Sequence, residues 1–185
     1  DRAARAIGNG VALIVVFSAL VTLFGLLFLD PILSILGATP SLRPYAREYL
    51  TVIIPGSVFI ATAISSNHAV RAEGQARYAM RIMLIGAGLN IVLDPIFIFA
   101  LGLGVRGAAI ATVLAQCISF LYALRFYLSG KSELPVRLRH VRIDLGITGE
   151  VVALGLGPFV RQFGQSLFIL ITNNVLNAFG DELAI

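Results

Sequence analysis

Five long apolar stretches constrain this chain more than any other feature of its sequence. A helix needs about 20 mostly apolar residues to cross a bilayer. Five segments have that length, and they lie at residues 7–29, 49–70, 79–101, 105–128 and 158–179. The 185 residues are 58% hydrophobic and only 13% charged, which leaves too few charges to cover the surface of a soluble domain. The sequence therefore predicts an all-α fold, a polytopic bundle of transmembrane helices.

The basic residues between these stretches predict how the chain is oriented in the membrane. Lys and Arg concentrate in cytoplasmic loops. One side collects Arg2, Arg5, Arg71, Arg77, Arg81, Arg125, Lys131, Arg137, Arg139 and Arg142. The other side has only Arg43, Arg47 and Arg106. We therefore expect a multi-pass protein of the plasma membrane with a cytoplasmic N-terminus. Its net charge of +4 needs no nucleic-acid partner.

The longest connection, residues 129–157, is the best candidate for a boundary between two structural halves. Apolar residues recur with acids between positions 143 and 156, which predicts a short amphipathic helix at the inner membrane surface. Gly155, Gly157 and Pro158 are expected to break that helix before the last span begins.

Asp94 is the only acid well inside a predicted span, and a buried ionisable residue there is costly enough to suggest a function. Asn90 lies four residues earlier and so shares one helix face with Asp94. Pro95 lacks an amide hydrogen, which frees the carbonyl of Ile91 one turn away. The competing interpretation is that Asp94 only satisfies the kink left by the proline. We favour the functional one.

Helix rise places further polar groups beside Asp94. Asp94 and Thr112 each lie seven residues from the turn between their spans, about 10 Å below the outer surface at 1.5 Å per residue. The same arithmetic pairs Asn90 with Gln116, about 16 Å deep. Hard cations such as sodium prefer oxygen ligands, and a protonatable carboxylate serves a proton-driven cycle equally well. We therefore predict a cation site at Asn90, Asp94 and Thr112.

The last span carries a stripe of polar residues, many of them three or four positions apart: Gln162, Gln165, Ser166, Thr172, Asn173, Asn174 and Asn177. Such a stripe faces a watery cavity or joins helices by hydrogen bonds, and both readings stay open. We expect Gln162, Gln165 and Asn173 to line a substrate cavity together with Gln116. Asn67 and His68 lie well away from Asp94 in depth and could form the cavity floor, although interfacial packing is favoured for His68.

Two other motifs have simpler interpretations. Asp30 and Pro31 repeat the Asp-Pro pair at the outer end of the first span, where we predict a simple helix stop. Residues 102–107 read G-x-G-x-x-G, as in dinucleotide-binding folds. The preceding apolar run is about 20 residues, too long for a strand of 5–6. These glycines therefore predict a tight turn between two spans.

The segments 90–99 (NIVLDPIFIF) and 104–112 (GVRGAAIAT), with 70–74 (VRAEG), closely resemble the multidrug and toxic compound extrusion (MATE) family. The resemblance implies twelve helices in two six-helix lobes, of which this chain supplies helices three to seven. The chain begins with Asp1 and is expected to be an excerpt of a longer protein. It would then divide into residues 1–130, the end of the first lobe with four spans, residues 131–157, a cytoplasmic connection, and residues 158–185, the first span of the second lobe.

The resemblance also implies a function. Family members are secondary antiporters that export amphipathic, often cationic drugs or toxins in exchange for sodium or protons. Asn90, Asp94 and Thr112 match a cation-linked polar site of the first lobe, and Asn67 matches a polar cavity position. Sodium-coupled relatives often carry an acid in the seventh helix, where this chain has Gly164 and Gln165, so we expect coupling through the first lobe.

The remaining expectations concern what the protein is not. We expect no enzymatic activity, no cofactor other than the coupling ion, and no transport without the rest of the transporter. The alternative function is a flippase for lipid-linked oligosaccharides from the same broad superfamily. That activity should need more cationic residues inside the bundle, and only Arg161 is a candidate.

Overall fold

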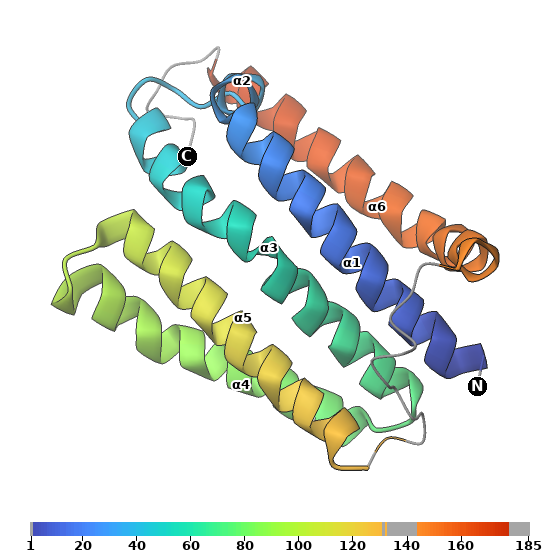
Figure 1. The fold of residues 1–185 in the computed structure, drawn as a ribbon. Coiled ribbons are helices and arrows are strands. Elements are labelled where there is room, and N and C mark those ends of the chain that lie inside the picture. Colours follow the sequence, from blue (N-terminus) through green and yellow to red (C-terminus); the bar gives the residue numbers. More distant parts are fainter. Residues whose placement is uncertain (1, 131, 133–143, 178–185) are drawn as a thin grey trace.

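The computed structural model describes residues 2–130, 132 and 144–177, and every regular element among them is helical (Figure 1). The elements are α1 (Arg2–Leu27), α2 (Leu29–Ile35), α3 (Arg43–Ala72), α4 (Ala76–Pro95), the π-helical turn η1 (Ile96–Ala100), α5 (Gly104–Leu128) and α6 (Leu145–Asn177). The prediction of an all-α fold is confirmed.

Five of these helices are long and apolar enough to cross a membrane, as the sequence predicts. The candidate spans are Arg5–Leu27, Arg43–Ala72, Ala76–Ala100, Gly104–Leu128 and Gly146–Val175. Large apolar side chains on them are exposed, for example Phe99 at 80% and Leu154 at 81%. Such a surface suits contact with lipid or with further helices rather than with water. The chain is therefore part of a multi-pass membrane protein.

Helix α3 occupies the centre of the arrangement. It packs against α1 on one side and against the α4–α5 hairpin on the other, while α6 packs against α1 on the face away from the hairpin (Figure 1). Small residues on α5 let the helices approach closely, because Ala109, Ala111 and Ala115 are fully buried. The site described below therefore lies between α3, α4 and α5.

The charge asymmetry coincides with the two ends of the bundle. The start of α1, the end of α3, the start of α4 and the end of α5 all lie at one end, which we call the inner end (Figure 1). These segments carry the described members of the basic group, Arg2, Arg5, Arg71, Arg77, Arg81 and Arg125. Arg43, Arg47 and Arg106 lie at the start of α3 and of α5, at the outer end. Lys131, Arg137, Arg139 and Arg142 lie outside the described residues.

A compact core holds the inner ends of α3, α4 and α5 together. Its buried members are Val70, Ala79, Ile82, Ala123 and Phe126. Tyr78 packs on this core and stacks against Tyr122, with ring centroids 4.9 Å apart. Its hydroxyl donates a hydrogen bond to the Tyr122 carbonyl at 3.2 Å. The aromatic contacts fix the register of the hairpin at this end, and thus the depth of the residues further along it.

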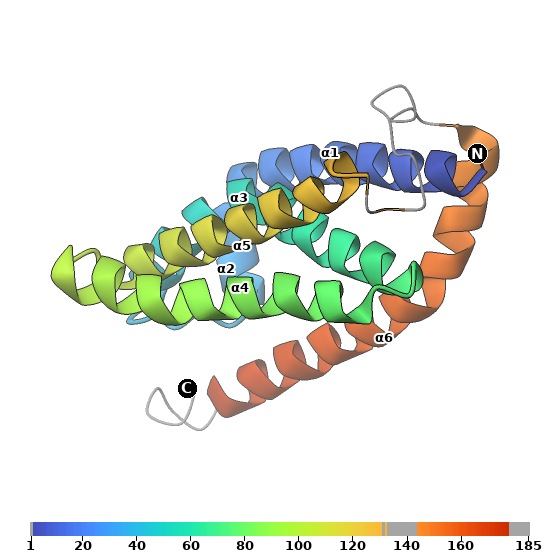
Figure 2. The ribbon, with the colours of Figure 1, turned by 90° about the horizontal axis from the view of Figure 1, so that it is seen from below.

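One prediction about α6 is wrong. Residues 143–156 do not form a separate helix that ends at the glycines, because α6 runs without a break through Gly155, Gly157 and Pro158. The views show the helix bent, with its first turns running in a different direction from the rest (Figures 1 and 2). Pro and Gly are tolerated inside membrane helices and commonly bend them rather than end them. The proposed boundary between halves stays a prediction.

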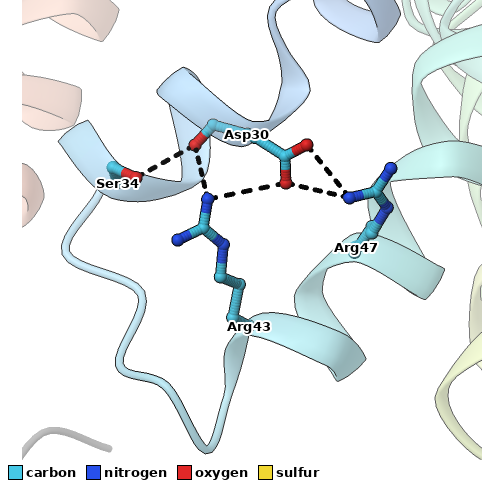
Figure 3. A network of polar contacts seen from close by, with 4 residues as sticks. All are labelled: Asp30, Ser34, Arg43 and Arg47. Atoms are coloured by element: carbon cyan, nitrogen blue, oxygen red, sulfur yellow. Dashed lines mark hydrogen bonds and ion pairs between the residues drawn. The ribbon is translucent and has the colours of Figure 1, made fainter.

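Asp30 lies in the first turn of the short helix α2, not at the end of α1. Helix α1 already ends at Leu27, and Pro31 is accommodated in the first turn of α2, where no intrahelical amide bond is lost. Arg47 Nη1 donates to both Asp30 carboxylate oxygens, at 2.9 and 3.0 Å, and Arg43 Nη2 lies 3.5 Å from Oδ1 (Figure 3). Asp30 therefore joins α2 to the start of α3 at the outer end.

Candidate functional site

The turn between α4 and α5 sets the geometry of the predicted cation site. Pro95 ends α4, and η1 follows with a wide turn in which the Leu101 amide donates to the Ile96 carbonyl at 2.9 Å. Gly102 and Gly104 have φ angles of +64° and +53°, which glycine adopts most readily. The glycine motif is thus a tight connection between two helices, as predicted.

Gly107 lets α5 pack directly on this turn. A Cβ atom at Gly107 would lie 2.5 Å from the carbonyl oxygen of Phe97, closer than real contacts allow. The backbones of α5 and η1 therefore touch at the third glycine of the motif. This contact holds the start of α5, and with it Thr112 further along the same helix, against the end of α4.

Asn90 brings the three predicted cation-site residues together. Its Nδ2 lies 3.3 Å from Asp94 Oδ1 and 3.4 Å from Thr112 Oγ1. All three side chains are half-buried, on the facing sides of α4 and α5. A carboxylate, an amide and a hydroxyl thus meet between the two helices, as the depth arithmetic indicates.

The pairing differs from the prediction by about one helical turn. Asn90 lies opposite Thr112 rather than Gln116, and the Gln116 Nε2 instead lies 4.0 Å from where a Cβ of Gly86 would be. The π-helical turn η1 accounts for the direction of this shift. Its wider coil advances less along the axis per residue, so the end of α4 lies nearer the outer surface than a straight α-helix would place it.

A pocket of about 300 Å³ opens beside this cluster, toward the inner end. It is lined from α3, α4 and α5 by Ala63, Ile64, Asn67, His68, Ile82, Met83, Gly86, Ala87, Asn90, Thr112, Gln116 and Ser119. The structure thus brings together Asn67 and Gln116 with two members of the cation site. Asp94 is not part of the lining, and Asn90 connects its carboxylate to the pocket. His68 is exposed and lies on the lining, consistent with a place on the cavity floor.

Asn67 is engaged in bonds that hold the bundle together. Its Nδ2 donates to the Ala79 carbonyl at 2.6 Å, and its Oδ1 accepts from Arg71 Nη2 at 3.2 Å. Both ends of the amide are thus occupied, so Asn67 fixes α3 against α4 and shapes the pocket by position. Asn90 is engaged through its Nδ2 alone, and among the described residues Gln116 has no hydrogen bond through its side chain.

The predicted cavity residues of α6 do not join this pocket. Gln162 and Gln165 are exposed, and Asn173 lines a different pocket of about 430 Å³ with residues of α2, α3 and α5. Other members of the stripe bond carbonyls of their own helix: Ser166 bonds Gln162, Thr172 bonds Phe168 and Asn174 bonds Leu170, at 3.0, 2.8 and 2.9 Å. The side chain of Asn177 lies outside the described residues.

The chemistry of the Asn90–Asp94–Thr112 cluster fits a weakly held cation better than a tightly bound metal. Among the described residues there is no group of three His, Cys, Asp or Glu side chains that could hold a metal ion. Hard cations such as sodium prefer oxygen donors of this kind, and a carboxylate can also take up a proton. The contribution of the Ile91 carbonyl stays a prediction.

Gly86 and Ser119 also line the pocket, and sequence reasoning did not single them out. Ser119 is 2% exposed and donates to the Ala115 carbonyl at 2.9 Å. A Cβ on Gly86 would lie 2.7 Å from Ser119 Oγ, so the glycine makes room for the hydroxyl. The spacing of Thr112, Gln116 and Ser119, four and then three residues apart, places all three on one helix face and could have identified the serine.

Comparison with known proteins places this arrangement in a family. The MatE family model matches residues 1–96, more than half of the chain. The multidrug export protein MepA of Staphylococcus haemolyticus (strain JCSC1435) is 28% identical over 166 residues, covering 90% of this chain and 37% of that protein. MepA of Staphylococcus aureus (strain MRSA252) is 29% identical over 160 residues, covering 86% and 35%. The chain thus spans little more than a third of the length of these relatives.

Solved structures agree in fold. The MATE multidrug transporter DinF-BH superposes with a TM-score of 0.87 at 35% identity, over 97% of this chain and 45% of that one. A MATE family transporter in an inward-facing conformation gives a TM-score of 0.82 at 28% identity, over 95% and 46%. On the match of the family model to more than half of its residues, supported by these structures, this chain belongs to the MatE family of multidrug and toxic compound extrusion (MATE) transporters.

Proposed function

We propose that the full-length protein containing this chain is a secondary antiporter that exports amphipathic, often cationic drugs or toxins in exchange for sodium or protons. The observation that carries the proposal is the position of Asn90. Its amide contacts Asp94 and Thr112 while also lining the pocket between α3, α4 and α5. The names of the relatives, multidrug export proteins, support an export function.

Coupling would act through the charge of Asp94. An ionised carboxylate at membrane depth favours a cation nearby, either a coupling ion or a cationic substrate in the adjoining pocket. Sodium binding or protonation would neutralise that charge and remove the attraction, so ion and substrate would compete. A ligand shifts a conformational equilibrium only through unequal affinity for the two states. The cluster would supply that inequality if the two states of the transporter arrange α4 and α5 differently.

Three residues would hold the coupling ion. Asp94 would provide the charged oxygen, Thr112 a hydroxyl oxygen and Asn90 an amide oxygen once its side chain turns. Apart from His68, the pocket lining carries no ionisable side chain, and apolar groups such as Ile64 and Met83 lie beside the amides. Such a lining suits amphipathic molecules better than strongly hydrated ones.

The test uses the complete protein in bacterial cells that lack their own efflux pumps. Efflux of a fluorescent cationic dye is followed with the native protein and with Asp94→Asn at equal membrane expression. Asp30→Asn is the matched control, because it removes the same charge from the same dipeptide at the surface. We expect efflux to fall with Asp94→Asn and to persist with Asp30→Asn.

The other outcomes are equally informative. Unchanged efflux with Asp94→Asn would make Asp94 a structural residue and refute coupling at this cluster. No dye efflux even by the native protein would turn attention to a lipid-linked oligosaccharide flippase. Efflux by the isolated 185-residue chain would contradict our expectation that the rest of the transporter is required.

A further inference from the structure

Asn9, near the inner end of α1, is buried completely, and among the described residues its side chain bonds only to the start of α6. It is 0% exposed. Its Nδ2 donates to the carbonyl oxygen of Asp144 at 3.0 Å, and its Oδ1 accepts from Thr148 Oγ1 at 3.2 Å. These partners lie 135 and 139 residues further along the chain. Both ends of this fully buried amide therefore find their partners at the start of α6, its oxygen through a hydroxyl proton shared with the Asp144 carbonyl, and leaving the amide without these partners would be costly.

The Asp144 and Thr148 partners are themselves held at the start of α6, Asp144 directly before its first residue and Thr148 in its first turn. Asp144 Oδ1 accepts from the Gly146 amide at 3.0 Å and thereby caps the helix. The Asp144 carbonyl accepts from the Thr148 amide at 2.7 Å and from its hydroxyl at 2.8 Å. Asn9 thus bonds to a helix start that is capped and held by its own hydrogen bonds.

At its outer end, α6 contacts α2 through a much weaker interaction. Asn174 Nδ2 reaches the Ile35 carbonyl of α2 at 3.3 Å, and the Asn174 side chain is exposed. The same Nδ2 lies 2.9 Å from the Leu170 carbonyl of its own helix. Losing the contact with Ile35 would therefore leave Asn174 satisfied, whereas losing the contact with α6 would leave Asn9 unsatisfied.

A segment that bends easily lies between these two contacts. Gly155, Gly157 and Pro158 fall inside α6, and neither glycine position has an atom within 4 Å of an added Cβ. Helix α6 curves in its first part (Figure 2). Proline removes one helical hydrogen bond and glycine adds backbone freedom, so bending costs least here.

We propose that Asn9 is a positioning residue that fixes the first turns of α6 to α1. The remainder of α6 then swings about residues 155–158 and breaks its contact with Ile35 at the outer end. The first turns of α6 would thus move with the first lobe, and the second lobe would begin to move independently only beyond Pro158. This pivot rests on the proposed transport function and deepens it by assigning the part of α6 that moves, but its test does not need transport.

Distances between spin labels on the full-length protein test the pivot. In a background without native cysteines, including Cys117→Ser, an inner pair is placed at Arg5 and Val152, and an outer pair at Leu27 and Ile171. The distance distribution of each pair is measured by double electron–electron resonance on the protein in lipid, with and without sodium, at low and at neutral pH. We expect one narrow, constant distance for the inner pair. For the outer pair we expect two populations whose ratio changes with conditions.

Variants then test whether Asn9 is what holds the first turns of α6 against α1. Asn9→Ala and Thr148→Val should each add a second, longer distance for the inner pair. Thr172→Val is the matched control, since among the described residues the Thr172 hydroxyl bonds only within α6, and it should leave the inner pair unchanged. An inner pair that stays narrow in Asn9→Ala would overturn the proposal, and so would inner and outer pairs that move together. Thr148→Val removes a single hydroxyl and keeps the test valid if Asn9→Ala does not fold. Dye efflux, measured separately, distinguishes failure of the pivot from failure of the proposed transport function.

Discussion

Asp30 and Asp94 are both followed by proline near the outer ends of membrane spans, yet their surroundings differ in kind. Asp30 has a side chain 47% exposed and pairs with Arg43 and Arg47 (Figure 3). Asp94 is half-buried, and among the described residues its contacts are to the neutral amide of Asn90 and, through it, the hydroxyl of Thr112. The same dipeptide thus serves a surface ion pair in one place and an uncompensated acid in the other.

The difference teaches that depth and partners, rather than the motif, decide what an acid can do. The Asp30 charge is neutralised by two permanent arginines, which leaves little for a coupling ion to add. Asp94 forms no ion pair among the described residues. A cation from solution would therefore stabilise the Asp94 carboxylate more than the Asp30 carboxylate. Four predictions test this contrast, from the largest expected effect to the smallest.

The largest effect is expected for ion release on substrate binding. Asp94→Asn should abolish most of the release of protons or sodium caused by dye binding, because it removes the group through which ion and dye would change each other's affinity, an effect of roughly 5- to 150-fold for coupled sites. Purified full-length protein is titrated with dye in weakly buffered solution, and in a parallel experiment with radioactive sodium. Asp30→Asn should release as much as the native protein. An equal loss of ion release in both variants would contradict the proposed difference between Asp94 and Asp30.

Gly107→Ala should destabilise the protein next most strongly. The added methyl group would meet the Phe97 carbonyl, and overpacking a rigid backbone contact costs about 1–3 kcal/mol. Thermal unfolding of the full-length protein in detergent measures the change. Gly88→Ala is the control, because nothing lies within 4 Å of its Cβ position, and the added methyl should be neutral or stabilise α4 by about 1 kcal/mol. Equal effects would mean that the α4–α5 turn is not closely packed.

Thr112→Val should weaken ion binding more modestly. It removes one long hydrogen bond and one oxygen ligand, worth about 0.5–1.5 kcal/mol, and keeps the shape of the side chain. The midpoint of ion-dependent dye displacement measures the effect. Thr51→Val removes an exposed hydroxyl that bonds only the nearby Glu48 carbonyl, and it should not shift the midpoint. A shift in both would point to a general change in α3–α5 packing.

The smallest effect is expected at the surface cluster. Removing the Asp30 charge should lower the free energy of unfolding by about 0–1 kcal/mol, since exposed ion pairs are weak. The difference between native protein and Asp30→Asn, measured by thermal unfolding, should shrink further at high salt because salt screens the pair. A large, salt-independent loss would show that Asp30 is as critical to the fold as Asp94 is proposed to be to coupling.

Much of the candidate site could be predicted from the sequence. The i, i+4 spacing put Asn90 and Asp94 on one face, and equal distances from the turn put Thr112 near them. The structure brings the three side chains together through Asn90, while their role as a cation site stays a prediction. The pairing of Asn90 with Gln116 was wrong because η1 is wider than an α-helix. The grouping of Gln162 and Gln165 with this pocket was not observed, since a polar stripe does not reveal which neighbour it faces.

The sequence by itself determined the membrane class, the five spans and the polar layer of the hairpin, because these depend on apolar run length, charge in loops and local helix periodicity. Only the tertiary structure decided that α6 continues through Pro158, that Arg43 and Arg47 neutralise Asp30, and that Asn9 bonds the start of α6. The last two outcomes depend on contacts between residues 13 to 139 positions apart. No local pattern encodes such pairings, because a polar side chain carries no sign of which distant backbone will reach it.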